Sequence, residues 1–157
     1  MKRNQPPVLR DTKEKDGYGW LFPNMVRTSL LTGDYSLEGF YENNRFVVER
    51  KATPGELYNN FFQKDKWIAF QAELTRLEAF QHSFVICEFT YSQLATFPDS
   101  ANLHPSIKQR LRVPGSVFVR RLLEIQLKYK TRFLFAGEGF GRSMFESLSQ
   151  RITEQYL

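Results

Sequence analysis

Residues 46–51, FVVERK, begin with apolar residues rich in β-branching and end with three charged residues, which predicts a β-strand that finishes in charge. Side chains on a strand point to opposite faces in turn, so Val47, Glu49 and Lys51 share one face. Arg50 points to the other face. A carboxylate and an amine therefore lie side by side where the strand ends. A solvated ion pair is one explanation of this pattern, and such exposed pairs contribute little to stability.

A β-hairpin is predicted for residues 28–51, because apolar stretches flank the polar turn ENN at 42–44. The sequence GDY marks the start of its first arm, so the two arms bring Asp34 towards Glu49. Before the hairpin, residues 6–14 (PPVLRDTKE) predict a first strand that ends in charge. The glycine-containing sequence DGYGW supplies a turn after that strand.

After residue 56 the spacing of apolar residues changes to that of a helix. The segment predicts one or two amphipathic helices, with Glu73 and Arg76 on the polar side. The apolar side consists of residues that recur at spacings of three and four: Trp67, Phe70, Leu74 and Leu77.

Strands and helices alternate through the second half of the chain. Buried strands are predicted at residues 83–89 (SFVICEF) and 131–137 (TRFLFAG), and long helices at 117–129 and 141–155. A loop with a short helical piece is expected in residues 97–116. Such alternation is typical of an α/β layer architecture.

The composition indicates one folded unit. Of 157 residues, 41% are hydrophobic and 15 are phenylalanine, which excludes a wholly disordered chain. We expect a single domain at residues 8–157 after a flexible segment at 1–7. No apolar run approaches the roughly 20 residues that cross a bilayer, so a cytoplasmic protein without a membrane partner is expected. The single cysteine, Cys87, excludes an internal disulfide and is expected to be buried.

The charge of the chain is basic and unevenly distributed. The formal net charge is +5, with a pI near 9.4. A polyanion is one partner that such a distribution fits, although many soluble domains carry a basic face without one. The excess is concentrated in one segment, at Lys108, Arg110, Arg112, Arg120 and Arg121.

Three acidic positions can meet near the hairpin: Asp11 ends the first strand, Asp34 belongs to GDY, and Glu49 belongs to ERK. Their oxygen atoms suit a hard divalent cation, with the Lys51 amine beside it. Metal-dependent phosphodiester hydrolysis requires such a set, because the cation neutralises the phosphate and lowers the pKa of a bound water. The lysine orients that water or supports the developing charge.

The motifs RDTKE, GDY, VVERK and AFQAELTRLEAFQHSFVICEF, in this order within residues 8–90, resemble the nuclease domain of XPF-type structure-specific endonucleases. That family has an Asp-x-Arg-Glu strand, a GDY hairpin, the pattern V-E-R-K-x-x-x-D-L, and a helix of the form R-F-x-x-E-x-x-R-L. The resemblance implies an α/β, restriction-endonuclease-like fold of the PD-(D/E)xK type, with a central mixed sheet between helices in three layers. It also implies a DNA endonuclease that uses Mg²⁺ or Mn²⁺ on branched or flap DNA in repair or recombination.

The resemblance assigns roles to particular side chains. Asp34 and Glu49 are expected as metal ligands and Lys51 as the catalytic lysine. Asp11 is expected as a further metal ligand, with Glu14 as an accessory acid beside it.

Three positions depart from the family pattern. Lys13 stands where the family has arginine, which keeps the charge but not the bidentate geometry for phosphate. The family has an acid four positions after the lysine of ERK, and this position is occupied by Gly55 here. We interpret Glu56, one position later, as the substitute for that acid. Ala69 replaces the helix arginine. Arg50 fits either a salt bridge behind the site or a phosphate contact.

The resemblance also bears on organisation and partners. Eukaryotic and archaeal members carry a helix-hairpin-helix tail, and we expect the standalone form of bacteria and phages here. Two other functions remain open, namely a non-catalytic DNA-binding or scaffolding subunit, and an α/β protein whose acids bind a structural ion. Members commonly dimerise through the last helices, so a homodimer is expected through apolar residues that could equally be core: Leu122, Ile125, Phe145 and Leu148.

Overall fold

The computed structural model of the chain describes residues 5–111 and 113–156. Most of the segment expected to be flexible, residues 1–4, therefore lies outside the described residues. The secondary-structure elements follow one another in this order: β1 (Val8–Asp11), β2 (Met25–Thr28), β3 (Tyr35–Leu37), β4 (Phe46–Lys51), α1 (Pro54–Phe62), α2 (Lys64–Leu77), β5 (His82–Cys87), α3 (Tyr91–Ala95), α4 (Pro105–Arg110), α5 (Gly115–Lys128), β6 (Arg132–Phe135) and α6 (Gly141–Gln155).

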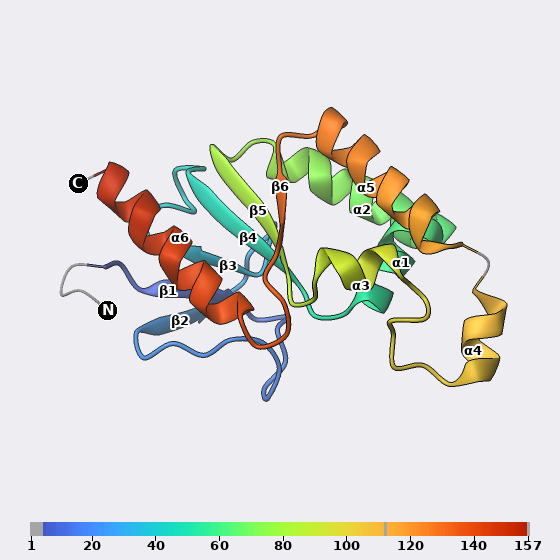
Figure 1. Cartoon of the computed structure of the whole chain (residues 1–157). Coiled ribbons are helices and arrows are strands. Elements are labelled where there is room, and N and C mark those ends of the chain that lie inside the picture. Colours follow the sequence, from blue (N-terminus) through green and yellow to red (C-terminus); the bar gives the residue numbers. More distant parts are fainter. Residues whose placement is uncertain (1–4, 112, 157) are drawn as a thin grey trace.

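The strands form one six-stranded sheet in the order β2-β1-β3-β4-β5-β6 (Figure 1). Strand β3 runs antiparallel to both of its neighbours, whereas β1 with β2 and β4 with β5 and β6 are parallel. The sheet is therefore mixed, as expected. The predicted hairpin is present as β3 and β4.

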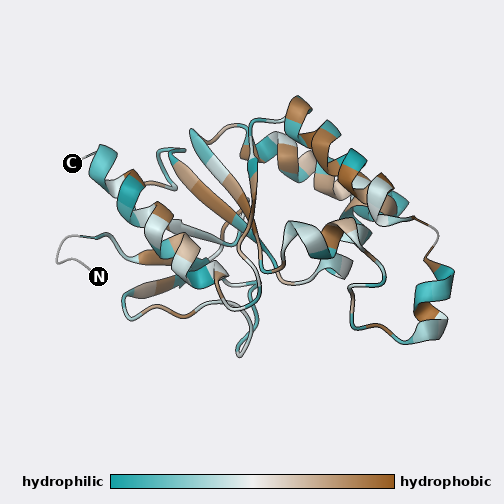
Figure 2. Ribbon diagram, viewed as in Figure 1, coloured by the Kyte–Doolittle hydropathy of each residue, from teal (hydrophilic) through white to brown (hydrophobic). Residues whose placement is uncertain are grey.

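Helices cover both faces of the sheet. Helix α6 packs on one face, and α1, α2 and α5 pack on the other, so the fold has three layers (Figure 1). Figure 2 shows hydrophobic and hydrophilic residues alternating along the helices that flank the sheet. Strand β4 contributes to both cores, because Val47 belongs to the core under α1, α2 and α5 while Phe46 and Val48 belong to the core under α6. This confirms the predicted division of its faces.

Most predicted elements are observed, and the main omission is β2. This edge strand has exposed residues at Val26 and Arg27, so it lacks the apolar alternation that identifies a strand. Helix α1 also begins earlier than expected, at Pro54, because the Thr53 hydroxyl caps it by accepting a hydrogen bond from the Glu56 amide.

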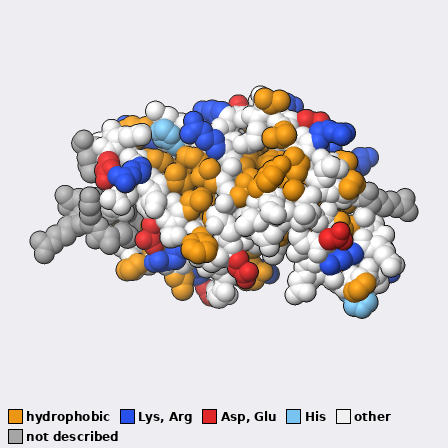
Figure 3. All heavy atoms as spheres, in the orientation of Figure 1, with side chains coloured by type: hydrophobic (Ala, Val, Ile, Leu, Met, Phe, Trp, Pro, Cys, Tyr) orange, Lys and Arg blue, Asp and Glu red, His pale blue; other side chains and the backbone are white. Residues whose placement is uncertain are grey.

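The residues proposed for dimer contacts lie largely inside the protomer. Leu122, Ile125 and Phe145 are buried in the two cores, and Leu148 packs against one of them. The homodimer stays a prediction, and its interface would have to be formed by side chains other than these four. Figure 3 shows hydrophobic side chains gathered on the face that carries α6, β6 and α5.

Two further expectations concern Cys87 and the membrane. Cys87 is a free cysteine with a fully buried side chain, as expected, and burial raises the pKa of its thiol. In the part of the chain that the structure describes, no helix is both long enough and apolar enough to cross a bilayer.

We predict that Phe145→Ala destabilises the protein by about 3–5 kcal/mol, as expected for a buried phenylalanine in a tight core. The Phe145 ring is fully buried, and its centroid lies 5.2–5.8 Å from the rings of Trp20, Phe22, Tyr35 and Phe46. Urea unfolding followed by tryptophan fluorescence measures the change.

The matched control is Leu127→Ala, because Leu127 is 90% exposed. Its free energy of unfolding should stay within about 0.5 kcal/mol of wild type. Equal effects of the two substitutions would contradict the assignment of Phe145 to the core.

Candidate active site

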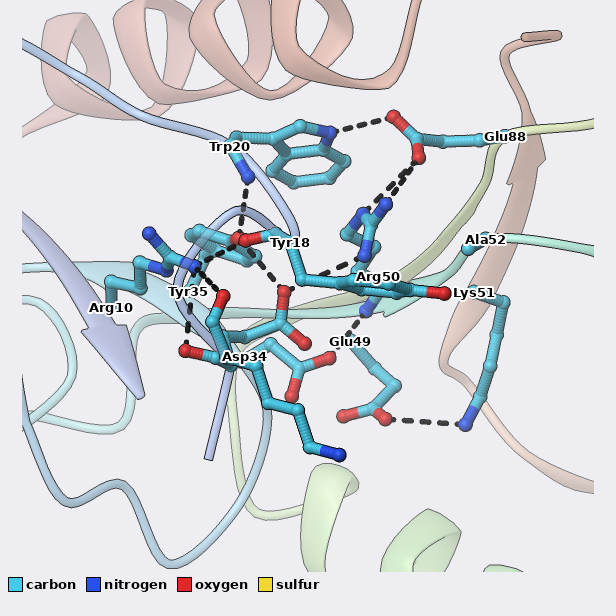
Figure 4. A network of polar contacts seen from close by, with 12 residues as sticks. Arg10, Tyr18, Trp20, Asp34, Tyr35, Glu49, Arg50, Lys51, Ala52 and Glu88 are labelled. Atoms are coloured by element: carbon cyan, nitrogen blue, oxygen red, sulfur yellow. Dashed lines mark hydrogen bonds and ion pairs between the residues drawn. The ribbon is translucent and has the colours of Figure 1, made fainter. Parts of the chain in front are cut away.

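Strand β4 places Glu49 and Lys51 on the side of the sheet that faces α1 and α2. Both side chains are buried, with 8% and 5% exposure. The Lys51 Nζ atom lies 3.3 Å from Glu49 Oε1 (Figure 4). The same Nζ atom lies 3.9 Å from Glu56 Oε1. The pair is therefore not the solvated ion pair of an exposed strand end.

Asp34 is fixed between two strands by its own backbone. Its amide donates to the Val48 carbonyl at 2.8 Å, and its carbonyl accepts from the Asp11 amide at 2.8 Å. Its Oδ2 atom accepts a hydrogen bond from the Arg50 amide at 2.8 Å. Gly33 makes this approach possible, because it has φ +80° and an added Cβ would lie 2.2 Å from Val47 Cγ2.

Helix α2 brings a third carboxylate to the site, that of Glu73. Its negative charge contributes to raising the pKa values of Asp34, Glu49 and Lys51. The sequence pattern placed Glu73 on the polar side of the helix, away from the sheet, but it faces the site. The sequence did carry a signal for Glu73, because Glu73 and Arg76 stand at the acid and arginine positions of the family helix pattern R-F-x-x-E-x-x-R-L.

A cavity of about 440 Å³ opens where these elements meet. Lys66 and Arg76 give it two cationic groups besides Lys51. It is lined by Lys51, Glu56, Asn59, Asn60, Lys66, Ala69, Phe70, Glu73 and Arg76.

The crowding of carboxylates changes their protonation. Burial raises the pKa of Asp34 to about 7; the Arg50 amide and Lys51 lower it, whereas the charges of Glu14 and Glu73 raise it. Burial, together with the charge of Asp34 and the charge and hydrogen bond of Glu73, raises the pKa of Glu49 well above its ordinary value. Full ionisation of these carboxyl groups would crowd negative charge into the site, and both groups therefore hold their protons to a higher pH than usual.

Lys51 responds in the opposite direction. Burial alone would lower the pKa of its amine, but the charges of Glu49, Glu73, Glu56 and Asp34 outweigh burial and raise it. Lys51 is thus a protonated ammonium at neutral pH. The group can donate hydrogen bonds and stabilise negative charge, but it cannot accept a proton.

Asp11 does not line this cavity. Its side chain is 1% exposed, and its Oδ1 atom accepts a hydrogen bond from the Leu30 amide at 2.9 Å. The carboxylate thereby fixes the chain between β2 and β3. Its role as a metal ligand stays a prediction, and its structural connection to the site is the backbone hydrogen bond to Asp34.

Arg50 lies on the opposite side of β4, where it forms ion pairs. Its guanidinium donates to Glu88 Oε2 at 2.8 and 3.1 Å, and its Nη1 atom lies 3.6 Å from Glu14 Oε2 (Figure 4). Glu88 also accepts from the Trp20 indole at 2.7 Å, and Glu14 accepts from the Tyr35 hydroxyl at 2.9 Å. Of the two roles considered for Arg50, the structure shows the salt bridge behind the site.

Glu56 and Lys13 occupy the border of the site. Glu56 lies at the start of α1, where its Oε2 atom accepts from the Ala52 amide at 2.9 Å. Its other carboxylate oxygen, Oε1, lies 3.9 Å from Lys51 Nζ, as expected for a substitute of the acid that follows ERK. Lys13 is exposed and lines a neighbouring cavity with Glu14.

Two members of the predicted basic cluster already contact other groups of the protein. The Arg121 guanidinium packs over the rings of Trp67 and Phe62, and the Lys108 amine donates to the Asp99 carbonyl at 3.2 Å. Arg110 and Arg120 are exposed, and Arg112 lies outside the described residues.

The donor set suits a hard cation by its chemistry. Asp34, Glu49 and Glu73 supply carboxylate oxygens, which are the ligands of Mg²⁺ and Mn²⁺. A cation would favour the ionised form of Asp34 and Glu49, whose pKa values burial and neighbouring negative charges raise. Among residues 5–111 and 113–156, no three His, Cys, Asp or Glu side chains are already grouped for metal binding. Side-chain movements would therefore have to accompany binding.

Comparison with solved structures identifies similar folds. XPF from Aeropyrum pernix matches 94% of this chain with a TM-score of 0.63 and 19% identity. The structure of XPF from Aeropyrum pernix in complex with DNA matches 96% of the chain with a TM-score of 0.63 and 20% identity. The chain spans 65% and 66% of those two chains, which is just under two thirds.

The fold is restriction-endonuclease-like. The mixed six-stranded sheet between helices and the match to the XPF structures confirm this expected class. Protein-family profiles and curated protein sequences give no match to the chain. At this level of identity, the match establishes the fold alone.

We predict that Asp34→Asn stabilises the protein at pH 8 by about 1–3 kcal/mol and has little effect at pH 4. The folded carboxyl has a pKa of about 7, against an ordinary value of 3.8. Between these values the folded state retains a proton that the unfolded state has lost, so stability falls as the pH rises. Asparagine does not titrate, so it removes this loss of stability at high pH. Its side-chain oxygen still accepts the hydrogen bond from the Arg50 amide.

Urea unfolding at the two pH values measures the effect, with exposed Asp99→Asn as the control. The control should not change stability at either pH. A pH-independent difference between wild type and Asp34→Asn would contradict the assigned pKa.

Proposed function

We propose that this protein is a metal-dependent DNA endonuclease that hydrolyses phosphodiester bonds. The observation that carries the proposal is the burial of Lys51 with three carboxylates beside one cavity, in a fold similar to that of XPF. The similar structure of XPF in complex with DNA supports DNA as the substrate.

In this proposal, Asp34, Glu49 and Glu73 hold Mg²⁺ or Mn²⁺. The bound cation supplies charge neutralisation of the phosphate and lowers the pKa of a bound water. Lys51, held as an ammonium by its carboxylate neighbours, orients the attacking water or stabilises charge that develops on the phosphate. Lys66 and Arg76, which line the same cavity, contribute positive charge for the sugar-phosphate chain.

The proposed substrate is branched or flap DNA, with a role in repair or recombination, and the proposed assembly is a homodimer. The apolar face that carries β6, between α6 and α5, supports the homodimer (Figure 3). Leu123 is 54% exposed on α5 and adds apolar surface to that helix.

We predict that Lys51→Met lowers the rate of metal-dependent DNA cleavage at least about 100-fold, the usual effect of removing one stabilising donor. Labelled single-stranded, duplex, flap, fork and four-way-junction DNAs are incubated with Mg²⁺, Mn²⁺ or EDTA. The matched control, Lys130→Met, replaces an exposed lysine before β6 and should cut like wild type.

Removing Lys51 leaves buried carboxylates unpaired, so the folding of the variant is checked by thermal unfolding. Glu49→Gln, which preserves the shape of the side chain, provides a second inactive variant. Cutting by either variant at the wild-type rate would place the active site elsewhere. Salt-sensitive DNA binding by wild type without cutting would instead support a scaffolding subunit.

A further inference from the structure

The loop that joins β1 to β2 is held in place by a buried arginine. Arg10 is fully buried in β1, and its Nη2 atom donates to the carbonyls of Glu14 at 3.3 Å and Lys15 at 2.9 Å. The same atom donates to the carbonyl of Tyr18. A charged donor that binds several carbonyls fixes the loop backbone, because breaking the contacts would leave a buried charge uncompensated.

This anchored loop presents an aromatic side chain to solvent. Tyr18 is 60% exposed, and Gly17 and Gly19 on either side of it have φ +76° and +79°. The Arg50 guanidinium lies 5.6 Å from the centroid of the Tyr18 ring, so the active-site strand supports the ring from one side. Trp20, two residues later, is instead buried in the core under α6.

Tyr18 lines a cavity that adjoins the active site. The cavity measures about 610 Å³, and Glu56 and Asn59 line both this cavity and the one that contains Lys51 and Glu73. Its volume is sufficient for a nucleotide. Its lining residues are Lys13, Glu14, Lys15, Tyr18, Ala52, Thr53, Gly55, Glu56 and Asn59.

We propose that Tyr18 stacks on an unpaired base next to the phosphate that is cut, while Lys13 and Lys15 contact the adjoining backbone phosphates. This inference rests on the proposed function and specifies its substrate as DNA with a single-stranded segment. A base can stack on a protein ring only where its face is free, and in a duplex both faces are covered by neighbouring bases. Because the Arg10 contacts already fix the loop backbone that carries the ring, the backbone loses little freedom when the ring binds.

The test measures DNA binding in EDTA, where no cleavage occurs. Fluorescence anisotropy is recorded for single-stranded, flap and duplex DNA with wild type, Tyr18→Ala and Tyr18→Phe. Tyr18→Ala should weaken binding to single-stranded and flap DNA roughly tenfold and to duplex less than about twofold. Tyr18→Phe should bind like wild type, since phenylalanine keeps the stacking ring.

Two further measurements separate stacking from other effects. Tyr91→Ala, which removes a tyrosine that is 51% exposed on α3, serves as the matched control and should leave binding unchanged. The salt dependence of binding should be unaffected by Tyr18→Ala and reduced by Lys13→Ala with Lys15→Ala, because only the lysines contact phosphate. Fluorescence of 2-aminopurine, scanned along the unpaired strand, should be quenched at one position by wild type but not by Tyr18→Ala.

The outcomes distinguish this inference from the nuclease proposal. If Tyr18→Ala binds single-stranded and flap DNA like wild type, or loses duplex affinity equally, the stacking role is overturned while the nuclease proposal stands. If the Tyr18 results are as expected but Lys51→Met still cuts DNA, the nuclease site is wrong and the stacking role stands. Absence of DNA binding by wild type would overturn both.

Discussion

Strand β4 is buried on both faces, yet it ends in three charged side chains, and each of these requires a partner. Arg50 finds its partners on the α6 side, in Glu88 and Glu14. Lys51 finds its partners on the α1 and α2 side, where Glu49 lies 3.3 Å away. The strand thus separates a paired structural ion network from a site crowded with carboxyl groups.

The crowding of carboxyl groups is what makes the second side chemically distinctive. An ion pair alone would satisfy Lys51, but Glu49 also has Asp34 and Glu73 as neighbours, and burial together with their charges raises its pKa. Buried like charges cost free energy, so a protein retains them mainly where a cation or a reaction uses them. Gly33 contributes to this arrangement, because its positive φ and its lack of a side chain let Asp34 lie against β4.

The ion network on the other face connects the site to the anchored loop. Arg50 is paired with Glu88 and lies near the exposed ring of Tyr18, while Glu14 belongs to the same loop. The loop that would contact DNA and the strand that carries Lys51 are therefore fixed to each other. This rigidity suits a site that must position a phosphate accurately.

The alternation of side chains predicted much of the site from sequence, because a strand has only two faces. It placed Glu49 and Lys51 together and Arg50 opposite, and the helical spacing predicted the final helix at the bounds that the structure shows. The role of Glu73 at the site was missed, because helical periodicity places it on the polar side of α2 but does not reveal that a cavity borders the apolar stripe. The burial of Arg10 depends on loop carbonyls that no local pattern reveals.

The central claim is that the carboxylates beside Lys51 form a site for a divalent cation. Anomalous X-ray scattering from a crystal soaked in Mn²⁺ tests it most directly, since the position of the ion does not depend on choosing the correct DNA. We predict an anomalous peak next to the carboxylate oxygens of Asp34 and Glu49, on the side of β4 that carries Lys51. No peak there, or Mn²⁺ bound only elsewhere on the protein, would contradict the account.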